Sequence, residues 1–534
     1  MEEEPQSQSE LKSKILNAEL DILGEERINY KLTLRKKKYN DILSKKRIYP
    51  KNVNSSYELF ISKLKLPPNY QIIFSKEEDL INTALQSMKS DDVTIVKYGV
   101  CLIKTYLWNF LDDENVLNNL NLNFVSDMLN LLEKWGAKKE LQIIYNVLHI
   151  LTNYSYKNEN KLITKILLSS KGYKIWELCF DLQDYEIMSQ MMWMLHNATY
   201  KDSESSYNLI KSNFFRNKIF SFYSSETIIK HMHEKNPENI FYLIIQSGLG
   251  LFSNLISIQY PSSYDNLDKK KLSYTVFDLI LKYSQSTSDK IYHSCIYAIC
   301  LAVDEDYDLV NRIDGNNIGV NILYDILNKK FFSNENCVLH ANRILGNYIS
   351  VKSGLSEEFF NKCIQYEFDI FFGINLSIAV KETYWVLSNI LSDYNKAGFI
   401  ICLNEPFINK TMEKYRNPVE LNDINEIAYF FNCLINKCGV ENFINLIGKG
   451  YLDLTLNYSK MTFNHVRTLI TILQLIESSL DIGESFKDNF NGKNKVKEKC
   501  DEYGLKEVLE KYEDTENQNL FNIIDEIKNI YYNE

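Results

Sequence analysis

The most regular feature of the sequence is an apolar helical segment that ends in Asn, in most copies with a large residue four positions before its end. Clear copies end at Asn153, Asn197, Asn254, Asn347 and Asn389, and two weaker copies end at Leu301 and Cys433. Consecutive copies lie 44, 57, 47, 46, 42 and 44 residues apart. This spacing predicts a repeated helical unit, and the interval of 57 predicts an insertion between Asn197 and Asn254.

A period of roughly 40–47 residues is typical of armadillo and HEAT helical repeats. Each such unit has two or three helices that cannot bury their apolar faces alone, so stacking of neighbours supplies the core. The chain has 534 residues but only 18 Gly and 8 Pro. Because sheet-rich folds need frequent turn residues, this composition favours a long series of helices.

Charge divides the chain into a basic segment and an acidic remainder. Residues 27–47 hold nine basic residues and one acid, Asp41, so this stretch carries about +8. The whole chain has a net charge of -10, so the remaining residues carry -18. We expect a basic arm of this kind to bind an acidic partner or the acidic body of its own chain. The body itself is predicted to repel phosphates, so direct binding of nucleic acid is not expected.

Candidate chemistry for catalysis or metal binding is sparse. The ten Cys residues form no CxxC pair, and His231-x-His233 lacks further residues that would complete a metal site. Gly248-x-Gly250 is too short to indicate a phosphate-binding loop. No apolar run reaches the ~18 residues that a membrane span needs. We therefore expect no enzyme activity, no cofactor, no metal and no membrane insertion.

Four segments follow from these patterns. We expect an acidic, polar N-terminus over residues 1–26, a basic helix-forming segment over 27–50, and a linker over 51–70 that contains Asn54, Ser55 and the Pro67-Pro68 pair. A helical repeat region over 71–534 follows, whose last repeat spans about 500–534.

The basic segment, RINYKLTLRKKKYNDILSKKR from Arg27 to Arg47, resembles the importin-β-binding domain of the importin-α (karyopherin-α) family. That domain has a Leu-Arg-Lys core and a Lys/Arg-rich end about ten residues later. In this chain Leu34-Arg35-Lys36 and Lys45-Lys46-Arg47 fall at those places.

The repeats are also similar to those of the importin-α family. The family carries a Trp-x-x-x-Asn array along its concave groove, with Arg in place of Trp in the sixth repeat. Here Arg343 and Asn347 occupy that place in HANRILGN, and Trp385 and Asn389 follow in KETYWVLSN. The stretch from Gly504 to Tyr532 is similar to the family's last repeat.

The resemblance implies an all-α, right-handed superhelical solenoid of about ten armadillo repeats and a nuclear import adaptor. Such an adaptor binds Lys/Arg-rich nuclear localisation signals in its groove and links the cargo to importin-β. The partners implied are importin-β, proteins with basic localisation signals, and an export receptor with its small GTPase. The implied location is the cytoplasm and the nucleus, with shuttling through the nuclear pore.

The chemistry of such a groove accounts for the residue types. Asn carboxamides pair with the backbone of an extended peptide, since each offers a donor and an acceptor. Indole rings hold the stems of Lys and Arg, and carboxylates pair with their charges. The resemblance places a major cargo site at Asn153, Gln190, Trp193, Asn197, Asp202 and Asn254. It places a minor site at Arg343, Asn347, Glu382, Trp385, Asn389, Glu426 and Tyr429.

The resemblance also assigns roles in the basic segment. Carrier binding falls to Arg27, Lys31, Leu34, Arg35, Lys36, Lys37 and Lys38. Lys45, Lys46 and Arg47 imitate a localisation signal, so they are assigned an autoinhibitory role in which they compete with cargo for the groove.

Departures from the family pattern keep alternatives open. At the major site His149 and Gly250 replace two of three Trp residues, and at the minor site Cys433 replaces an Asn. Trp193 and Trp385 are alternatively core residues, since indoles are often buried. The chain is alternatively a general armadillo or HEAT scaffold, or a degenerate adaptor that no longer binds basic cargo. If it does bind such cargo, we expect the minor site to hold its share of binding or more.

Overall fold

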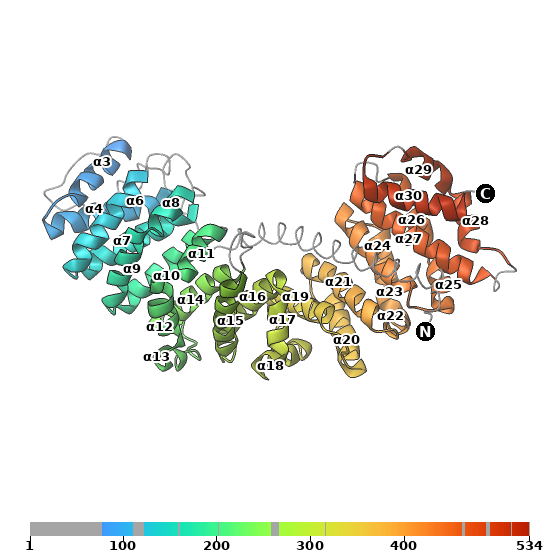
Figure 1. The fold of residues 1–534 in the computed structure, drawn as a ribbon, viewed down its shortest axis with the longest axis horizontal. Helices are drawn as coiled ribbons and strands as arrows, with labels where there is room; N and C mark the ends of the chain where they lie inside the picture. The colour runs from blue at the N-terminus through green and yellow to red at the C-terminus, as the bar shows by residue number, and fades with distance from the viewer. Residues whose placement is uncertain are drawn as a thin grey trace, which may run out of the picture. The chain divides into compact units, whose positions relative to one another are not determined.

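The computed structural model describes residues 77–110, 122–157, 161–200, 202–257, 266–315, 317–461, 465–487, 492–513 and 515–532. Every regular element in these ranges is a helix (Figure 1), which confirms the all-helical, solenoid-like fold expected from the sequence. The chain divides into two compact units, the first up to Leu182 and the second from Gln183 onward. The segments proposed at 1–26, 27–50 and 51–70, with all carrier-binding and autoinhibitory residues, lie outside the described residues.

Unit 1 is built from pairs of helices that pack against one another. Its helices are α3 (Glu77–Met88), α4 (Val93–Phe110), α6 (Leu122–Ala137), α7 (Leu141–Lys157), α8 (Lys161–Leu167) and α9 (Ser170–Asp181). Helix α4 packs against α3 and α7, and α6 packs against α7, α8 and α9.

Unit 2 is organised around long helices, each of which packs against the next. We call them the ladder helices: α10 (Tyr185–Thr199), α14 (Ile240–Ile256), α16 (Asp289–Glu305), α19 (Glu335–Val351), α21 (Ser377–Asp393), α24 (Leu421–Ile435), α27 (Val466–Ser485) and α30 (Gln518–Tyr531). Figure 1 shows α14, α16, α19 and α21 following one another in this order.

Further helices join the ladder helices and cover them. They are α11 (Ser203–Lys211), the π-helix η1 (Phe215–Phe220), α12 (Ser221–Ser224), α13 (Glu226–Ile229), α15 (Asn266–Tyr283), α17 (Tyr307–Asp314), α18 (Asn317–Leu327), α20 (Glu357–Gly373), α22 (Ala397–Leu403), α23 (Glu405–Arg416), α25 (Val440–Gly448), α26 (Tyr451–Met461), α28 (Lys495–Glu502) and α29 (Leu505–Lys511).

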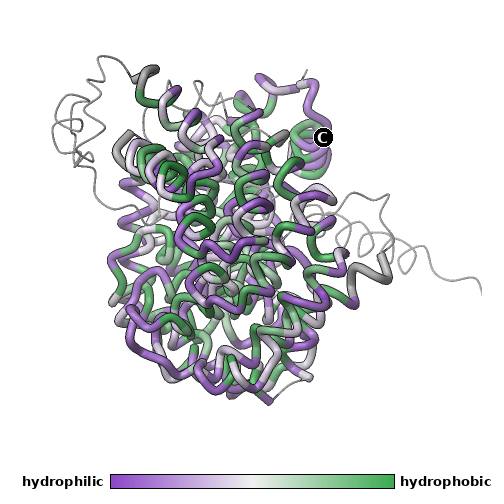
Figure 2. Tube along the Cα trace, turned by 90° about the vertical axis from the view of Figure 1, so that its left-hand side faces the viewer, coloured by the Kyte–Doolittle hydropathy of each residue, from purple (hydrophilic) through white to green (hydrophobic). Residues whose placement is uncertain are grey.

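The distribution of apolar residues explains why these segments fold together. Along most helices, hydrophobic and hydrophilic stretches alternate, as the green and purple sections of Figure 2 show. Ladder helices bury residues on more than one side because they contact neighbours in several directions: Ile344, Leu345 and Ile349 of α19 are fully buried. Burial of each such side chain contributes about 1.5–3 kcal/mol to folding.

Polar residues in the turns set where helices begin. The Asp184 carboxylate accepts a hydrogen bond from the Ile187 backbone N–H at the start of α10, and the Asn334 carboxamide does so from Asn336 and Cys337 at the start of α19. These side chains satisfy N–H groups that have no partner within the helix. Part of the Asn content of the chain therefore serves to cap helices.

The predicted insertion between Asn197 and Asn254 corresponds to the π-helix η1, the short helices α12 and α13, and the turn that leads to α14. Tyr223, buried on α12, donates a hydrogen bond of 2.8 Å to the Ile244 carbonyl of α14. Gly248 makes room for it, since a Cβ there would lie 2.6 Å from the Tyr223 hydroxyl oxygen.

The two histidines of the insertion serve in packing. His231 stacks on Phe241 with ring centroids 3.8 Å apart. The His233 Nδ1 accepts a hydrogen bond from the Thr287 backbone N–H. Each of the two rings therefore has a contact with another residue of unit 2.

Contacts between neighbouring helices repeat at the sequence period. Lys104 donates to Asn146, 42 residues away, and Lys381 pairs with Glu420, 39 residues away. The Thr471 hydroxyl donates to Asn425, 46 residues away. Equivalent helices therefore meet roughly one period apart, which is the behaviour of stacked repeats. The number of repeats and the hand of the superhelix remain predictions.

Candidate functional site

The predicted cargo-site residues fall on long helices of both units. In unit 1, α7 carries Asn153. In unit 2 they follow the ladder helices: Gln190, Trp193 and Asn197 on α10, Asn254 on α14, Arg343 and Asn347 on α19, Glu382, Trp385 and Asn389 on α21, and Glu426 and Tyr429 on α24, with Asp202 just after α10.

Arg343 lies at the centre of a buried ion-pair network that joins three consecutive ladder helices. Its Nη1 lies 3.4 Å from the Asp304 Oδ2 of α16, and its Nη2 lies 3.0 Å from the Glu382 Oε1 of α21. The three side chains are 4, 9 and 6% exposed. The Asn347 Nδ2 donates a 2.6 Å hydrogen bond to the other oxygen of Asp304. Two predicted cargo contacts, Arg343 and Glu382, thus bind one another.

A further acid lies beside this network. Glu367 of α20 is fully buried and accepts a 3.2 Å hydrogen bond from the Asn342 carboxamide of α19. Burial raises the pKa of Glu367 well above its ordinary value, and repulsion from Glu382 acts in the same direction. Hydrogen bonds from Thr383 and Asn342 oppose the shift. A raised pKa favours the uncharged form of Glu367, so the charged groups of this network are Arg343, Asp304 and Glu382.

Trp385 packs on the backbone of the preceding ladder helix. A Cβ added to Gly346 would lie 2.2 Å from the Trp385 Cζ3, so only Gly leaves room for the ring. One turn later, the Asn389 Nδ2 donates a 3.1 Å hydrogen bond to the Gly346 carbonyl. Both side chains are half-buried, so each retains an exposed part. The Asn389 carboxamide oxygen is the group left to accept a hydrogen bond from a peptide N–H.

Helix α24, the ladder helix after α21, carries an aromatic residue and an acid among the predicted cargo residues. Tyr429 and Glu426 are both half-buried on this helix, which packs against α21. Nearby, the Lys381 Nζ lies 3.1 Å from the Glu420 carboxylate and also pairs with Asp423. Lys381 therefore uses two acids of this surface, and Glu426 is the acid of α24 that the sequence assigns to cargo.

The α10–α14 region has a different composition. Trp193 is half-buried and meets the His196 ring edge-on, with centroids 5.6 Å apart. The Asn254 Nδ2 donates to the His196 carbonyl at 2.7 Å and lies 3.2 Å from the Thr199 hydroxyl. Asn254 is only 8% exposed, so its carboxamide is used mainly to join α14 to α10.

Other predicted residues of the major site have mixed surroundings. Asp202 is 8% exposed and caps α11, accepting hydrogen bonds from the Ser205 backbone N–H at 3.2 Å and hydroxyl at 2.8 Å. This capping role leaves little of the carboxylate for a cargo cation. Gln190 and Asn197 are half-buried on α10.

In unit 1, Asn153 is half-buried and its Nδ2 lies 3.2 Å from the His149 Nδ1 one turn earlier. Burial lowers the pKa of His149 to about 4, helped by repulsion from Lys104. His149 is therefore uncharged at neutral pH.

Three residues that contribute to this arrangement were missed by sequence reasoning. Asp304 binds both Arg343 and Asn347, and its only sequence signal is its position 39 residues before Arg343. Gly346 leaves the space in which the Trp385 ring packs. The His196 ring packs against Gly250: its Nδ1 would lie 3.1 Å from a Cβ added to that glycine.

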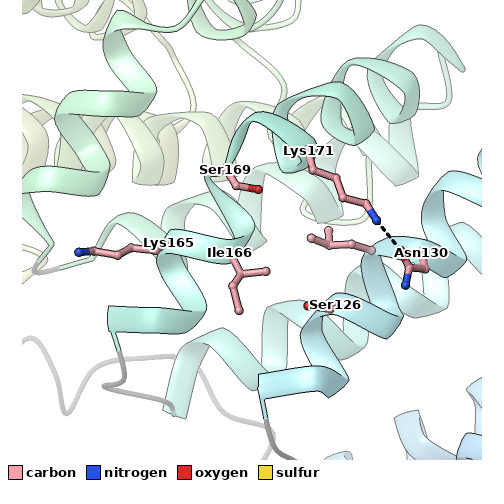
Figure 3. A pocket seen from close by; sticks show the side chains of 7 residues that line it. Ser126, Asn130, Lys165, Ile166, Ser169 and Lys171 are labelled. Atoms are coloured by element: carbon pink, nitrogen blue, oxygen red, sulfur yellow. Dashed lines mark hydrogen bonds between the residues drawn. The ribbon is translucent and has the colours of Figure 1, made fainter.

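A hollow of about 450 Å³ in unit 1 contains none of these residues (Figure 3). It lies between α6 and the α8–α9 turn and is lined by Ser126, Leu129, Asn130, Lys165, Ile166, Ser169 and Lys171. Lys171 donates to Asn130, the Ser169 hydroxyl caps α9, and Lys165 points away from the hollow. Three of its polar side chains, those of Lys171, Asn130 and Ser169, thus take part in hydrogen bonds within unit 1.

The described ranges also bear on metal sites and membrane spans. They contain no group of three or more His, Cys, Asp or Glu side chains placed to hold a metal ion. Among the helices that the structure describes, none combines the length and apolar character that crossing a bilayer requires.

Comparison with known proteins gives a likeness of fold. No family model matches the chain, and no curated protein matches it. It is similar to a crystal structure described as an engineered protein of the Northeast Structural Genomics Consortium, with a TM-score of 0.60 and 13% sequence identity. The match covers 84% of this chain and 97% of that one. At this identity the likeness concerns the arrangement of helices alone.

Proposed function

We propose that this protein is an importin-α-like nuclear import adaptor: an armadillo solenoid of about ten repeats, wound in a right-handed superhelix, that binds Lys/Arg-rich peptides along its ladder helices. The observation that supports this most directly is the row formed by Trp385 and Asn389 on α21 with Glu426 and Tyr429 on α24. All four side chains are half-buried on helices that pack side by side.

An extended basic peptide would use three kinds of contact in this row. Its Lys or Arg stems would lie against the Trp385 and Tyr429 rings, where cation–π attraction acts at the charged ends. A backbone N–H would donate to the Asn389 carboxamide oxygen. A cationic head would pair with Glu426.

The basic N-terminal segment supplies the second half of the proposed activity. Its nine positive charges suit an acidic carrier of the importin-β type, so binding to the carrier should weaken steeply with salt. Lys45, Lys46 and Arg47 would occupy the peptide row when no carrier is bound. A tether of about twenty residues gives an effective concentration of order mM, which competes with a cargo of micromolar affinity.

A second candidate is a degenerate adaptor or scaffold that does not bind basic cargo. The observation that favours it is that several predicted cargo residues bind other residues of the chain. Arg343 pairs with Glu382, Asn347 binds Asp304, and Asn254 is buried against α10. Side chains engaged in this way contribute to packing between repeats and are poorly placed to meet a ligand.

Titration of a fluorescent Lys-rich peptide against the full chain and against a chain without residues 1–50 distinguishes the candidates. The adaptor predicts binding that tightens on deletion and weakens with salt, while a peptide with its Lys replaced by Ala does not bind. Absence of binding to either chain would rule out basic cargo and favour the second candidate. Equal affinity of both chains would rule out autoinhibition alone.

A further inference from the structure

His293 of α16 lies against the residue that begins the neighbouring ladder helix, α19. That residue, Asn334, caps α19: its Oδ1 accepts hydrogen bonds from the backbone N–H groups of Asn336 at 3.2 Å and Cys337 at 3.4 Å. Its Nδ2 lies 3.2 Å from the His293 Nδ1. Both side chains are half-buried, and α16 packs against α19. One carboxamide thus joins the start of α19 to α16.

The cap fixes the orientation of the Asn334 carboxamide, and this orientation fixes the protonation of His293. Because the carboxamide oxygen is bound to the backbone of α19, the NH2 group faces the ring, and that group can only donate. The His293 Nδ1 must therefore accept, which requires a neutral ring that carries its proton on Nε2. A protonated ring has an N–H donor on both nitrogens, so two donors would then face one another.

Protonation of His293 would have one of two results. Either the ring moves away from Asn334, or the carboxamide turns over to offer its oxygen to the ring and leaves the first N–H groups of α19 without their cap. The new positive charge would also lie at the N-terminal end of α19, where the helix dipole disfavours it. Each result weakens the start of α19 or its contact with α16.

The surroundings of His293 favour the neutral ring. Burial lowers the pKa of His293, and Lys330 acts in the same direction, whereas Asp289 on its own helix acts to raise it. Lys330 is itself paired with Asp325 at 2.8 Å. Helix α19 brings Glu335, whose carboxylate accepts a hydrogen bond from the backbone just before α21. Among the described residues, no charged group of α14, α15 or α17, which also pack against α16, shifts the pKa of this ring.

We propose that the contact between His293 and Asn334 is a pH-sensitive switch: it holds the start of α19 at neutral pH and releases it when His293 takes up a proton. Since the folded pKa is lowered, the native chain binds this proton less tightly than the unfolded chain, whose value is near 6.5. The stabilisation is therefore complete above that pH and is lost as the pH falls toward the folded pKa. The switch is independent of the proposed peptide binding.

Nitrogen NMR of the full chain with isotope-labelled histidine tests the protonation of the ring. The chain has seven His residues, and the signal that disappears in His293→Gln belongs to His293. At pH 7.5 we expect its proton on Nε2, and on lowering the pH to 4.5 the ring should become charged with a midpoint below 6.5. A proton on Nδ1 at pH 7.5, or a ring that stays neutral at pH 4.5, would overturn the proposal.

Hydrogen exchange at the start of α19 tests the release. After correction for the pH dependence of intrinsic exchange, the Asn336 and Cys337 amides should exchange about fivefold faster when His293 is charged than at pH 7.5, as expected for loss of a helix cap. The uncharged His293→Gln should abolish this difference, and the charged His293→Arg should show the fast exchange already at pH 7.5. The control is His465→Gln, which changes an exposed His at the start of α27 and should leave the difference in place.

Equal exchange in the wild-type chain at both pH values, or a difference that persists in His293→Gln, would refute the switch. The wild-type comparison needs no variant to fold. A local measurement is used because the global melting temperature also reports Glu367, whose contribution to stability changes with pH in the opposite direction.

Discussion

The α10–α14 and α19–α21 regions are built from the same kind of Asn-ended helical segment, yet their chemistry differs. Around α19 and α21 an Arg, an Asp and a Glu are buried together, and the Trp385 ring rests on Gly346. Around α10 and α14 the contacts join neutral groups, with Asn254 donating to the His196 carbonyl and Trp193 meeting the His196 ring.

This difference shows that the sequence pattern determines the position of a side chain on its helix, whereas the neighbouring residues determine which interactions that side chain can make. Asn347 and Asn389 both belong to the α19–α21 region, but Asn347 is 1% exposed and bound to Asp304, whereas Asn389 is half-buried with a carboxamide oxygen to offer. A peptide-binding role is therefore better supported for Asn389 than for Asn347.

The buried ion pairs give the largest expected effect. Arg343→Ala leaves Asp304 and Glu382 buried without their cation, so we expect a loss of about 3–5 kcal/mol of stability. Asn254→Ala in the neutral region should cost less, about 1–3 kcal/mol. Urea unfolding followed by circular dichroism measures both.

The matched control for Arg343 is Arg312, which pairs with Asp278 while both side chains are more than a third exposed. Arg312→Ala should cost no more than about 1 kcal/mol. Similar losses for Arg312→Ala and Arg343→Ala would mean that burial of the network contributes nothing special.

The second prediction concerns Glu367 and pH. Since its pKa is raised in the folded chain, the native state holds the proton more tightly than the unfolded state, whose value is near 4.5. Stability attributable to this group is therefore present below pH 4.5 and falls as pH rises toward the folded pKa.

Glu367→Gln keeps the shape and removes this loss. The stability of the variant relative to the wild type should increase by at most about 1.4 kcal/mol for each pH unit above pH 4.5. Melting temperatures measured from pH 4.5 to 8 test it, and parallel pH profiles for the two chains would contradict the assignment.

The third prediction compares two glycines. Gly346→Ala forces a Cβ to within 2.2 Å of the Trp385 ring, so the ring must move and we expect a cost of about 1–3 kcal/mol. Gly250→Ala meets His196 at 3.1 Å, and the gain in helix propensity of about 0.5–1 kcal/mol offsets much of that strain. Thermal unfolding of both variants gives the comparison, and an equal or larger loss for Gly250→Ala would refute it.

The smallest expected effect is on peptide binding. Loss of one aromatic wall costs roughly 0.5–2 kcal/mol, or about two- to thirtyfold in affinity. We expect Trp385→Ala to weaken binding of a single-cluster basic peptide more than Trp193→Ala does, because Trp385 has Glu426 and the Tyr429 ring on the neighbouring helix α24. Fluorescence titration of both variants decides it, and a larger loss for Trp193→Ala would place the dominant site at α10.

Sequence reasoning captured the helical class and the positions of the recurring Asn residues, because both follow from local periodicity. Each of the five Asn-ended copies lies on a long helix. The 57-residue interval, in which an insertion was predicted, contains η1 and the short helices α12 and α13. The division of the chain at Leu182 was not predicted, since no change in composition marks it.

The partners of the site residues were beyond reach of the sequence. Asp304 follows a weak copy of the repeat and has no motif of its own, so its contact with Arg343 appears only when α16 and α19 are packed. Asp202 lies one residue beyond the position at which the sequence comparison expected an acid, and in the structure it caps helix α11. Pairings of this kind depend on distances between helices, which periodicity does not encode.

The ion pairs that cross from α16 through α19 to α21 have a mechanical consequence. In a stack where each helix contacts only its neighbours, the stiffness depends on each interface between two neighbouring helices, which we call a joint. Sliding α19 against either neighbour would separate buried opposite charges with no water to replace them, so these two joints resist shear strongly. Joints held by apolar contacts can slip over small distances at lower cost. Under tension, this part of unit 2 should therefore bend and stretch least, and neighbouring joints should yield first.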